Sequence, residues 1–419
     1  MASQLYADIT EIRQAPNGLA AKGFVPGVAG AGLLAVVGLV AWAIGSSDDN
    51  AVLWQQFCHA YLLAVMYVTS LGVGGLFFVL GHHITGGRWG TPVRRLAEVT
   101  ASTLSVSAVL YLPVLATVLW NDGSLYPWAS LWEAGKFISD DPILKSKSGY
   151  LEPQFFAIRS VIYYALWVWM ARTMLGMSVR QDSSEPLKRA KSMQWWAGPM
   201  ILLYALSMNF ASFDWMMSLE PHWFSTMFGV YFFAGSFGAF LALTMLLVIK
   251  LQERGVLTQS VTVEQRHDIA KLMFAFVVFW GYIAFSQYLL IWYAAIPEET
   301  LWYDIRQQGA WPFWGLLLVF GHLLIPFLGF MSSAVRRSPT MMKFWAVWML
   351  VIHWCDLAYI ILPQVRGEGS LTVALLLAVA TTLGALGVFA WAWMSGAAGK
   401  WLLPVQDPRL PISLSYHNH

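Results

Sequence analysis

Cysteine and charge are both scarce in this sequence of 419 residues. Only two cysteines occur, Cys58 and Cys355, and both lie inside apolar stretches. They form no CxxC pair, no haem-attachment motif and no disulfide framework. Charged residues make up 11% of the chain and apolar residues 58%. Because a soluble domain of this length cannot hide so much apolar surface, the composition indicates a membrane protein, and a net charge of +2 argues against nucleic acid as a partner.

Long apolar runs supply the secondary structure. A membrane-spanning helix needs about 20 mostly apolar residues. The sequence predicts ten such helices, over residues 25–44, 55–82, 97–120, 154–176, 194–213, 223–249, 269–295, 311–334, 341–362 and 371–395. We therefore predict an all-α integral membrane protein with an N-terminal tail (1–24), a ten-helix transmembrane domain (25–395) and a C-terminal tail (396–419). The first stretch is polar and lacks the build of a signal peptide, so we expect it to stay in the mature chain.

Lysine and arginine are distributed unequally between the two sides of these predicted helices. Most of them fall in the two tails and in loops 83–96, 177–193, 250–268 and 335–343. The opposite loops carry Lys136, Lys145, Lys147, Arg306 and Arg366. The basic side of a membrane protein faces the cytoplasm, so we predict that both termini are cytoplasmic. The longest loop, 121–153, then faces outward, where it could dock a partner.

Three ionisable residues are expected near the middle of the membrane. His322 lies in the predicted helix 311–334, roughly 16 Å from its outer end at 1.5 Å per residue. His353 lies at a similar depth in helix 341–362, and Asp356 follows one turn later on the same face. Such a group could pass a proton. Two alternatives are a polar packing contact between helices and a haem held between His322 and His353.

A second polar group is predicted at the outer ends of the first helices. Asp214, Glu220 and His222 lie in the acidic, tryptophan-rich run 212–229, which connects two apolar segments. The nearby outer turns of helices 55–82 and 154–176 contribute His59, Tyr61, Arg159 and Tyr163. Hydrogen-bonding groups, a proton acceptor and aromatic walls are what a quinone pocket needs. The alternative is an ion pair of Arg159 with Asp214 or Glu220 that holds the bundle together.

Glu98 opens a third candidate feature, on the cytoplasmic side. It begins a ladder of serine and threonine hydroxyls that continues to Ser107. The ladder could support a water-filled half-channel, with Glu98 at its entrance. The alternative is that these small residues allow close helix packing.

The run from Asp214 to Gly229, together with ten spans and internal termini, resembles the NrfD/PsrC-like membrane proteins. More narrowly, it is similar to the ActF membrane proteins of alternative complex III, a bacterial quinol:electron-acceptor oxidoreductase. The resemblance covers essentially the whole chain. It implies two four-helix bundles, helices 2–5 and 6–9, flanked by helices 1 and 10, in the bacterial inner membrane.

The same resemblance implies partners and cofactors. They are a paralogous NrfD-like membrane protein, an iron–sulfur/molybdopterin-like protein and multihaem cytochromes of the same complex, with a cytochrome c or a small copper protein as electron acceptor. The iron–sulfur clusters and c-type haems would belong to these partners. This chain is expected to bind no metal and no redox centre, but quinone or menaquinone could bind it. By resemblance, Asp214, Glu220 and His222 are motif positions of the family. They are further candidates for the proton path, with Asp214 and Glu220 as carboxylates at its exit side.

Three functions remain open on the sequence. The first is a non-haem component of a respiratory or photosynthetic quinol oxidoreductase that assists proton translocation and could hold quinone. The second is a secondary transporter, for which broken helices at matched positions of two halves are expected. The third is a structural scaffold of the same complex, in which the ionisable groups are only packing contacts.

Overall fold

The computed structural model describes residues 14–45, 51–120, 123–133, 141–365 and 369–415, and these ranges contain helices but no β-strand. Nine helices among the described residues are long and apolar enough to cross a membrane. They are α2 (Leu19–Gly45), α3 (Ala51–Ile84), the broken helix α4–α6 (Thr91–Leu119), α10 (Pro186–Trp215), α11 (Phe228–Glu253), α12 (Val263–Ala294), the broken helix α14–α15 (Trp311–Met331), α17 (Pro339–Ile361) and α18 (Leu371–Ala397). The prediction of a multi-pass, all-helical membrane protein is confirmed.

The remaining predicted span, 154–176, corresponds to α9 (Pro153–Gln181), which is 29 residues long. It is not among the nine, and its three arginines, Arg159, Arg172 and Arg180, make it less apolar than those helices. It packs along α10, and the Trp169 and Trp196 rings of the two helices meet edge to face with centroids 6.2 Å apart. Length and packing make α9 part of the same helical body.

Two of the long helices are interrupted. The helix predicted over 97–120 begins at Thr91 and is divided at Thr103 and Tyr111 into α4 (Thr91–Ser102), α5 (Leu104–Leu110) and α6 (Leu112–Leu119). Near the first division, the Thr103 hydroxyl donates to the Thr100 carbonyl at 2.7 Å, a contact that competes with the helix's own hydrogen bonds. The second division precedes Pro113, which has no N–H to donate.

The other interruption is a π-helical segment, η3 (Val319–Leu324), between α14 (Trp311–Leu318) and α15 (Ile325–Met331). It ends just before Pro326, whose missing N–H leaves one carbonyl of the preceding turn without its usual donor. A π-helical turn is rare and often marks a functional position. Trp348 of α17 donates its indole N–H to the Gly321 carbonyl at 2.7 Å and so stabilises the irregular backbone.

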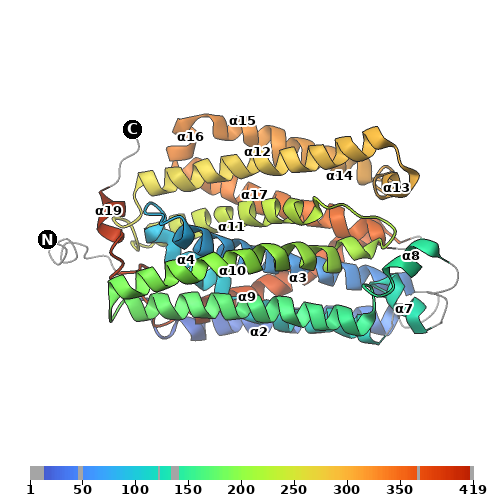
Figure 1. The fold of residues 1–419 in the computed structure, drawn as a ribbon, viewed down its shortest axis with the longest axis horizontal. Helices are drawn as coiled ribbons and strands as arrows, with labels where there is room; N and C mark the ends of the chain where they lie inside the picture. Colours follow the sequence, from blue (N-terminus) through green and yellow to red (C-terminus); the bar gives the residue numbers. More distant parts are fainter. Residues whose placement is uncertain (1–13, 46–50, 121–122, 134–140, 366–368, 416–419) are drawn as a thin grey trace.

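The central helix is α3, which is almost entirely enclosed by protein and contacts α4, α10, α11, α17 and α18 (Figure 1). Glycines allow these close contacts. A Cβ built on Gly74 would lie 2.7 Å from the Ser236 carbonyl of α11, so only glycine fits there. On the far side of the bundle α2 packs on α18, where a Cβ on Gly30 would collide with the Gly384 carbonyl.

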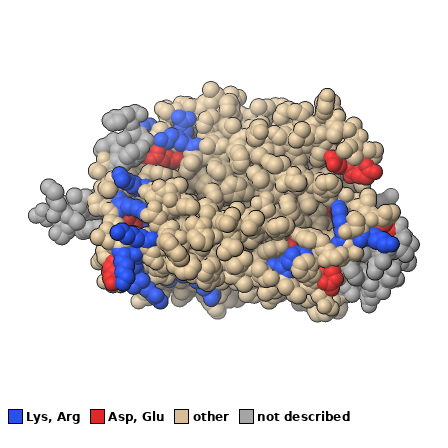
Figure 2. Space-filling model, viewed as in Figure 1, with Lys and Arg blue, Asp and Glu red and all other residues tan. Residues whose placement is uncertain are grey.

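The two ends of the helical body differ in charge. The short helix α19 (Leu410–Leu414) lies at one end, and α7 (Pro127–Glu133), α8 (Pro142–Lys147) and α13 (Pro297–Ile305) lie at the other (Figure 1). Lysines and arginines gather at the α19 end in the view of Figure 2, whereas the middle of that face is almost free of charge. This charge distribution agrees with the pattern predicted from sequence, although Lys136 and Arg366 lie outside the described residues.

Candidate functional site

Asp356 is the centre of a buried polar cluster between α11, α12 and α17. Its side chain is enclosed, with 2% of the residue exposed. The Tyr231 hydroxyl of α11 donates to Oδ1, and the Trp280 indole of α12 donates to Oδ2 at 3.1 Å. No lysine or arginine of the described chain forms an ion pair with it. A buried carboxyl without a cation is unusual, because neutral donors alone must compensate its desolvation.

His353 lies one turn before Asp356 and links the cluster to the central helix. Its Nε2 is hydrogen-bonded to the Ser70 hydroxyl of α3 at 2.9 Å, and Ser70 donates to the Tyr67 carbonyl at 2.7 Å. The other ring nitrogen, Nδ1, is buried without a hydrogen-bond partner in the described structure. One nitrogen of the His353 imidazole is therefore hydrogen-bonded to α3, and the other has no hydrogen-bond partner in the described structure.

Gly235 of α11 faces both ionisable groups. A Cβ built there would lie 3.0 Å from His353 Nδ1 and 3.4 Å from Asp356 Oδ2. This Cβ position is close to both atoms, so the unpaired imidazole nitrogen of His353 and the carboxylate of Asp356 both lie next to Gly235. A side chain at position 235 would press on both groups.

His322 joins the cluster through an aromatic contact. Its ring stacks on Trp280 with centroids 3.7 Å apart and planes inclined by 22°. Because Trp280 also donates to Asp356, the three residues predicted at the membrane centre (His322, His353 and Asp356) belong to one connected group. The position of His322 within η3 adds the irregular backbone typical of functional sites.

Sequence reasoning missed four members of this cluster: Ser70, Tyr231, Gly235 and Trp280. Each is a common residue in a long apolar helix, and nothing in the local sequence marks it. Only the packing of α3, α11 and α12 against α17 shows that they meet His353 and Asp356.

A pocket of about 540 Å³ opens beside Asp356, between α11, α12, α13, α14 and α17. Tyr231 and Trp280 form part of its wall, so the donors to Asp356 are also pocket residues. The volume lies in the range of small-molecule sites. Phe228, from the end of the 212–229 run, lines the pocket too, and Trp223 of that run stacks on Trp302 with centroids 4.9 Å apart.

Arg306 and Gln287 supply polar atoms to this pocket. The Arg306 guanidinium is buried and donates to the carbonyls of Tyr359, Trp302 and Ile360 at 2.7–3.0 Å. Burial lowers the pKa of Arg306 to about 9, so it stays a cation at neutral pH. Gln287 lies near Tyr303, but its buried Oε1 accepts no hydrogen bond of standard geometry. The pocket thus offers a cation and an acceptor within walls that include eight aromatic side chains.

The outer group predicted around Asp214 is an ion pair. Arg159 donates from Nε and Nη2 to the two carboxylate oxygens of Asp214, each at 2.9 Å, and Tyr163 donates to Oδ2 at 2.8 Å. The guanidinium also lies over the Tyr150 ring, 4.0 Å from its centroid. This geometry is the bidentate pairing that fixes two helices, α9 and α10, to each other.

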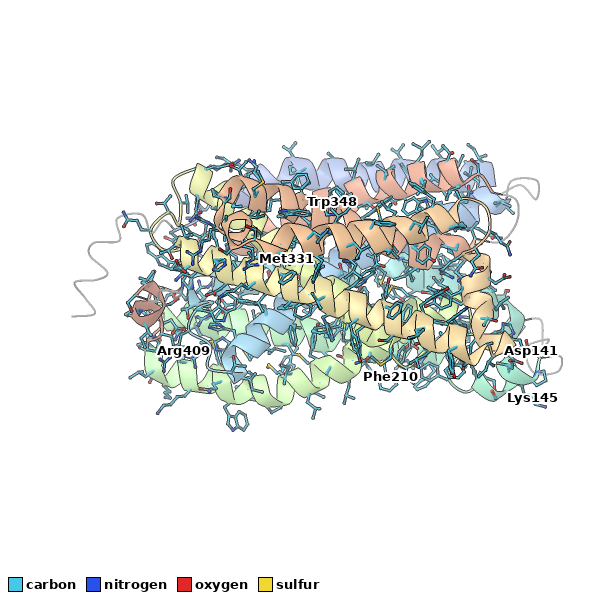
Figure 3. All side chains as sticks on the ribbon, turned by 90° about the horizontal axis from the view of Figure 1, so that it is seen from above. Asp141, Lys145, Phe210, Met331, Trp348 and Arg409 are labelled. Carbon is cyan, nitrogen blue, oxygen red and sulfur yellow. The ribbon has the colours of Figure 1, made fainter. Side chains whose placement is uncertain are left out.

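Glu220 and His222 form a separate contact at the surface. His222 Nδ1 lies 3.2 Å from Glu220 Oε1, and Nε2 lies 2.5 Å from Asp141 Oδ2. The other carboxylate oxygen of Asp141, Oδ1, caps α8. The hydrogen bond from His222 lowers the pKa of Asp141, as do the backbone N–H groups of α8. Asp141 lies at the end of the molecule opposite Arg409 (Figure 3). The turn 212–229 is therefore connected to the 141–148 segment.

The four quinone-site candidates do not line one cavity. Tyr61 donates to the Leu110 carbonyl at 2.7 Å and lines a pocket of about 1020 Å³ between α2, α3 and α6. His59, hydrogen-bonded through Nδ1 to the Gln55 carbonyl, is not a lining residue of that pocket. Arg159 and Tyr163 belong to the Asp214 ion pair described above.

Glu98 is neutralised by two arginines. It accepts from Arg94 Nε at 2.9 Å and from Arg95 Nε at 3.0 Å, and all three side chains are buried. Arg95 also pairs with Asp182 at 2.9 Å, and Arg94 with Asp407. The hydroxyl ladder beyond Glu98 packs on α3, where Thr103 Oγ1 lies 3.6 Å from a Cβ built on Gly72. Glu98 thus belongs to an ion network, whereas Asp356 does not.

Within the described residues, no group of three or more histidine, cysteine, aspartate or glutamate side chains is arranged to hold a metal ion. The apolar helices define a multi-pass helical membrane protein, and the described helices enclose a polar cluster around Asp356. No protein-family model matches this chain, and no curated protein matches it.

Proposed function

We propose that this chain is the non-haem membrane component of a quinol:electron-acceptor oxidoreductase of the alternative complex III type, and that it transfers protons through the Asp356 cluster. The observation that carries the proposal is the carboxyl of Asp356, which is buried among helices with hydroxyl, indole and imidazole neighbours but forms no ion pair with a described lysine or arginine. A structural carboxyl at such a position is expected to have an ion partner, as Asp214 has in Arg159. An unpaired carboxyl can instead gain and lose a proton.

The cluster supplies a short sequence of groups that exchange protons. Tyr231 can accept a proton from the pocket side while it donates its own to Asp356. His353 lies across Gly235 from Asp356 and is hydrogen-bonded to Ser70 on α3. Each member has both a donor and an acceptor state, which a relay requires. The proposed direction of travel is between the outer pocket and α3.

The pocket beside Asp356 favours a second activity of the same chain, the binding of a quinone or menaquinone ring. Arg306 can donate to one ring oxygen, and in the reduced quinol form Gln287 Oε1 can accept from the hydroxyl at the other, between aromatic walls. We prefer this pocket to the group His59, Tyr61, Arg159 and Tyr163, because those side chains do not converge on one cavity.

The remaining features of the proposal come from the resemblance and from charge. They are ten spans with α9 as the tenth, bundles of helices 2–5 and 6–9, cytoplasmic termini, and a place in the bacterial inner membrane. Partner proteins of the complex would supply iron–sulfur clusters and c-type haems. The gathering of lysine and arginine at the α19 end supports the orientation.

The experiment measures protons released per quinol oxidised by the complex in liposomes. Asp356→Asn removes the titrating group but keeps the acceptor for Tyr231, so electron transfer continues. Each quinol oxidised still releases its own two protons, and the protons released beyond these two fall to a small fraction. Cys355→Ser, the neighbouring buried position, serves as the control and keeps normal release. Unchanged release in Asp356→Asn would leave only a scaffold role. Substrate uptake by the isolated chain in liposomes would instead indicate a transporter.

A further inference from the structure

The pocket of about 1020 Å³ between α2, α3 and α6, called the groove below, lies at the end of the helical body that carries α7. α2 packs mainly on α18 and α6 packs on α9, so different neighbours hold the two walls. The α3 residues between Trp54 and Tyr61 form the floor. Leu39 of α2 and Leu112 of α6 line the groove and are 63% and 56% exposed. The groove therefore opens sideways, toward the surface that faces the bilayer.

The lining of the groove is suited to hydrocarbon. Its two hydroxyl groups donate within the protein, Tyr61 to the Leu110 carbonyl at 2.7 Å and Thr117 to the Val114 carbonyl at 2.8 Å. No charged residue and no histidine is among the described residues that line it. Apart from the Cys58 thiol, the other polar side-chain groups are tryptophan indoles toward the α7 end. A quinone ring needs polar groups that converge on its oxygens, and the floor of the groove does not supply them.

The length of the groove corresponds to one leaflet of the bilayer. Leu34 and Trp42 line it at two points of α2 that are about 12 Å apart along the axis, at 1.5 Å per residue. Half of the apolar core of a bilayer is about 15 Å thick. An acyl chain of the leaflet on this side could therefore lie in the groove for most of its length. Water is a poor occupant, because an apolar cavity offers it too few hydrogen-bond partners.

A second cavity of about 430 Å³, called the polar hollow below, adjoins the groove at its α7 end. Trp42 and Trp54 line both cavities. The described lining of the polar hollow also includes Gln55, Ser124 and Ser130, and it contains no charged side chain. Tryptophans are typical of the level at which lipid headgroups meet water. An apolar groove followed by an uncharged polar hollow matches the order of parts in a phospholipid, the acyl chain and then the ester groups.

We propose that the groove binds a phospholipid, with one acyl chain between α2, α3 and α6 and the glycerol ester groups in the polar hollow. The Gln55 amide and the Ser124 hydroxyl supply donors for the ester carbonyls. Exchange of one lipid for another gains little from the hydrophobic effect, so retention depends on the fit of the chain and on these hydrogen bonds. The bound lipid completes the packing between α2 and α6. The site is separate from the Asp356 cluster and does not rest on the proposed function.

The test uses the full-length chain, in the assembly in which the membrane yields it, in phosphatidylethanolamine vesicles. The vesicles contain a phosphatidylethanolamine with a diazirine in the middle of one acyl chain, and illumination attaches this probe to the residues around it. Peptide mass spectrometry is expected to find the probe on groove residues of α2, α3 and α6. Ala35→Trp places an indole in the groove and should reduce this labelling at least tenfold. Val36→Trp is the matched control, because Val36 is 59% exposed on the same helix but does not line the groove, and labelling should stay unchanged.

Thermal unfolding of both variants separates loss of the site from misfolding. Equal labelling of the groove in the two variants and the unchanged protein would indicate only the ordinary contact of bulk lipid, and would overturn the proposal. Unlabelled phosphatidylethanolamine should compete with the probe, whereas stronger competition by menaquinone would assign the groove to an isoprenoid tail instead. Gln55→Leu should weaken the competition by phosphatidylethanolamine several-fold. Unchanged competition in that variant would contradict the placement of the ester groups in the polar hollow.

Discussion

Replacing Gly235 by alanine tests the contact on which the proton-transfer proposal depends. The new methyl group would lie 3.0 Å from His353 Nδ1, 3.1 Å from Cε1 and 3.4 Å from Asp356 Oδ2. The two separations from the imidazole are a few tenths of an ångström too short, so the His353 ring must move, whereas the contact with Asp356 Oδ2 is an ordinary one. Overpacking of this kind costs about 1–3 kcal/mol. The gain from alanine over glycine inside a helix, about 0.5–1 kcal/mol, offsets only part of it.

Gly238, one turn further along α11, is the matched control. The nearest atom to a Cβ there is the Phe276 Cβ at 3.8 Å, an ordinary contact. Gly238→Ala is therefore expected to keep or slightly raise thermal stability and to leave proton release unchanged. Gly235→Ala should lower both the melting temperature of the purified complex and the protons released per quinol, with quinol oxidation retained. If the two variants behave alike in both assays, the apposition of His353 and Asp356 across Gly235 has no role.

Three further outcomes are expected. Tyr231→Phe removes one of the two donors to Asp356, so the protons released beyond the two of the quinol itself should fall about tenfold or more, whereas a scaffold role predicts a loss of stability of about 1 kcal/mol and normal release. Arg159→Gln leaves the buried Asp214 without its cation and should destabilise the complex by about 3–5 kcal/mol in thermal unfolding, while Asp214→Asn in the same chain should recover much of this. Burial opposes ionisation of Asp407, but Arg94 and a backbone N–H outweigh it and lower the pKa of this carboxyl. Because the folded-state pKa is depressed, the ion pair of Asp407 with Arg94 should stabilise the C-terminal segment 401–414 at neutral pH and be lost only as pH falls through that pKa, below the ordinary range of an aspartate. Maleimide labelling of a Ser413→Cys variant across pH would detect the loss.

The helices could be predicted from sequence because apolar length is a local property. Nine predicted spans coincide with described helices, and α9 was recognisable by its length although Arg159 and Arg172 reduce its apolarity. The π-helical turn at His322 could not be predicted. Proline at 326 indicates a kink, but the type of turn depends on the Trp348 side chain of another helix.

The candidate site was predicted only in part. Ionisable residues in apolar stretches are easy to recognise in a sequence, so His353 and Asp356 could be predicted. Their partners Tyr231 and Trp280 were not, because tyrosine and tryptophan are frequent throughout this chain. The sequence also could not show which acidic side chains form ion pairs and which do not. Glu98 pairs with Arg94 and Arg95 of its own helix α4, and Asp214 pairs with Arg159 of the neighbouring helix α9, whereas the lack of such a partner at Asp356 among the described residues is visible only in three dimensions.

The enclosure of α3 has a consequence for how the protein is assembled. This helix is apolar enough to enter a bilayer alone, and lipid tails would then surround it until the other helices arrive. Exchanging lipid contacts for protein contacts gains little from the hydrophobic effect, since lipid tails and the side chains of the neighbouring helices are similarly apolar. Its final position must then be selected by shape, through tight approaches such as that of Gly74 to α11. A bulkier residue at such a point would leave membrane insertion intact and would stop assembly one step later.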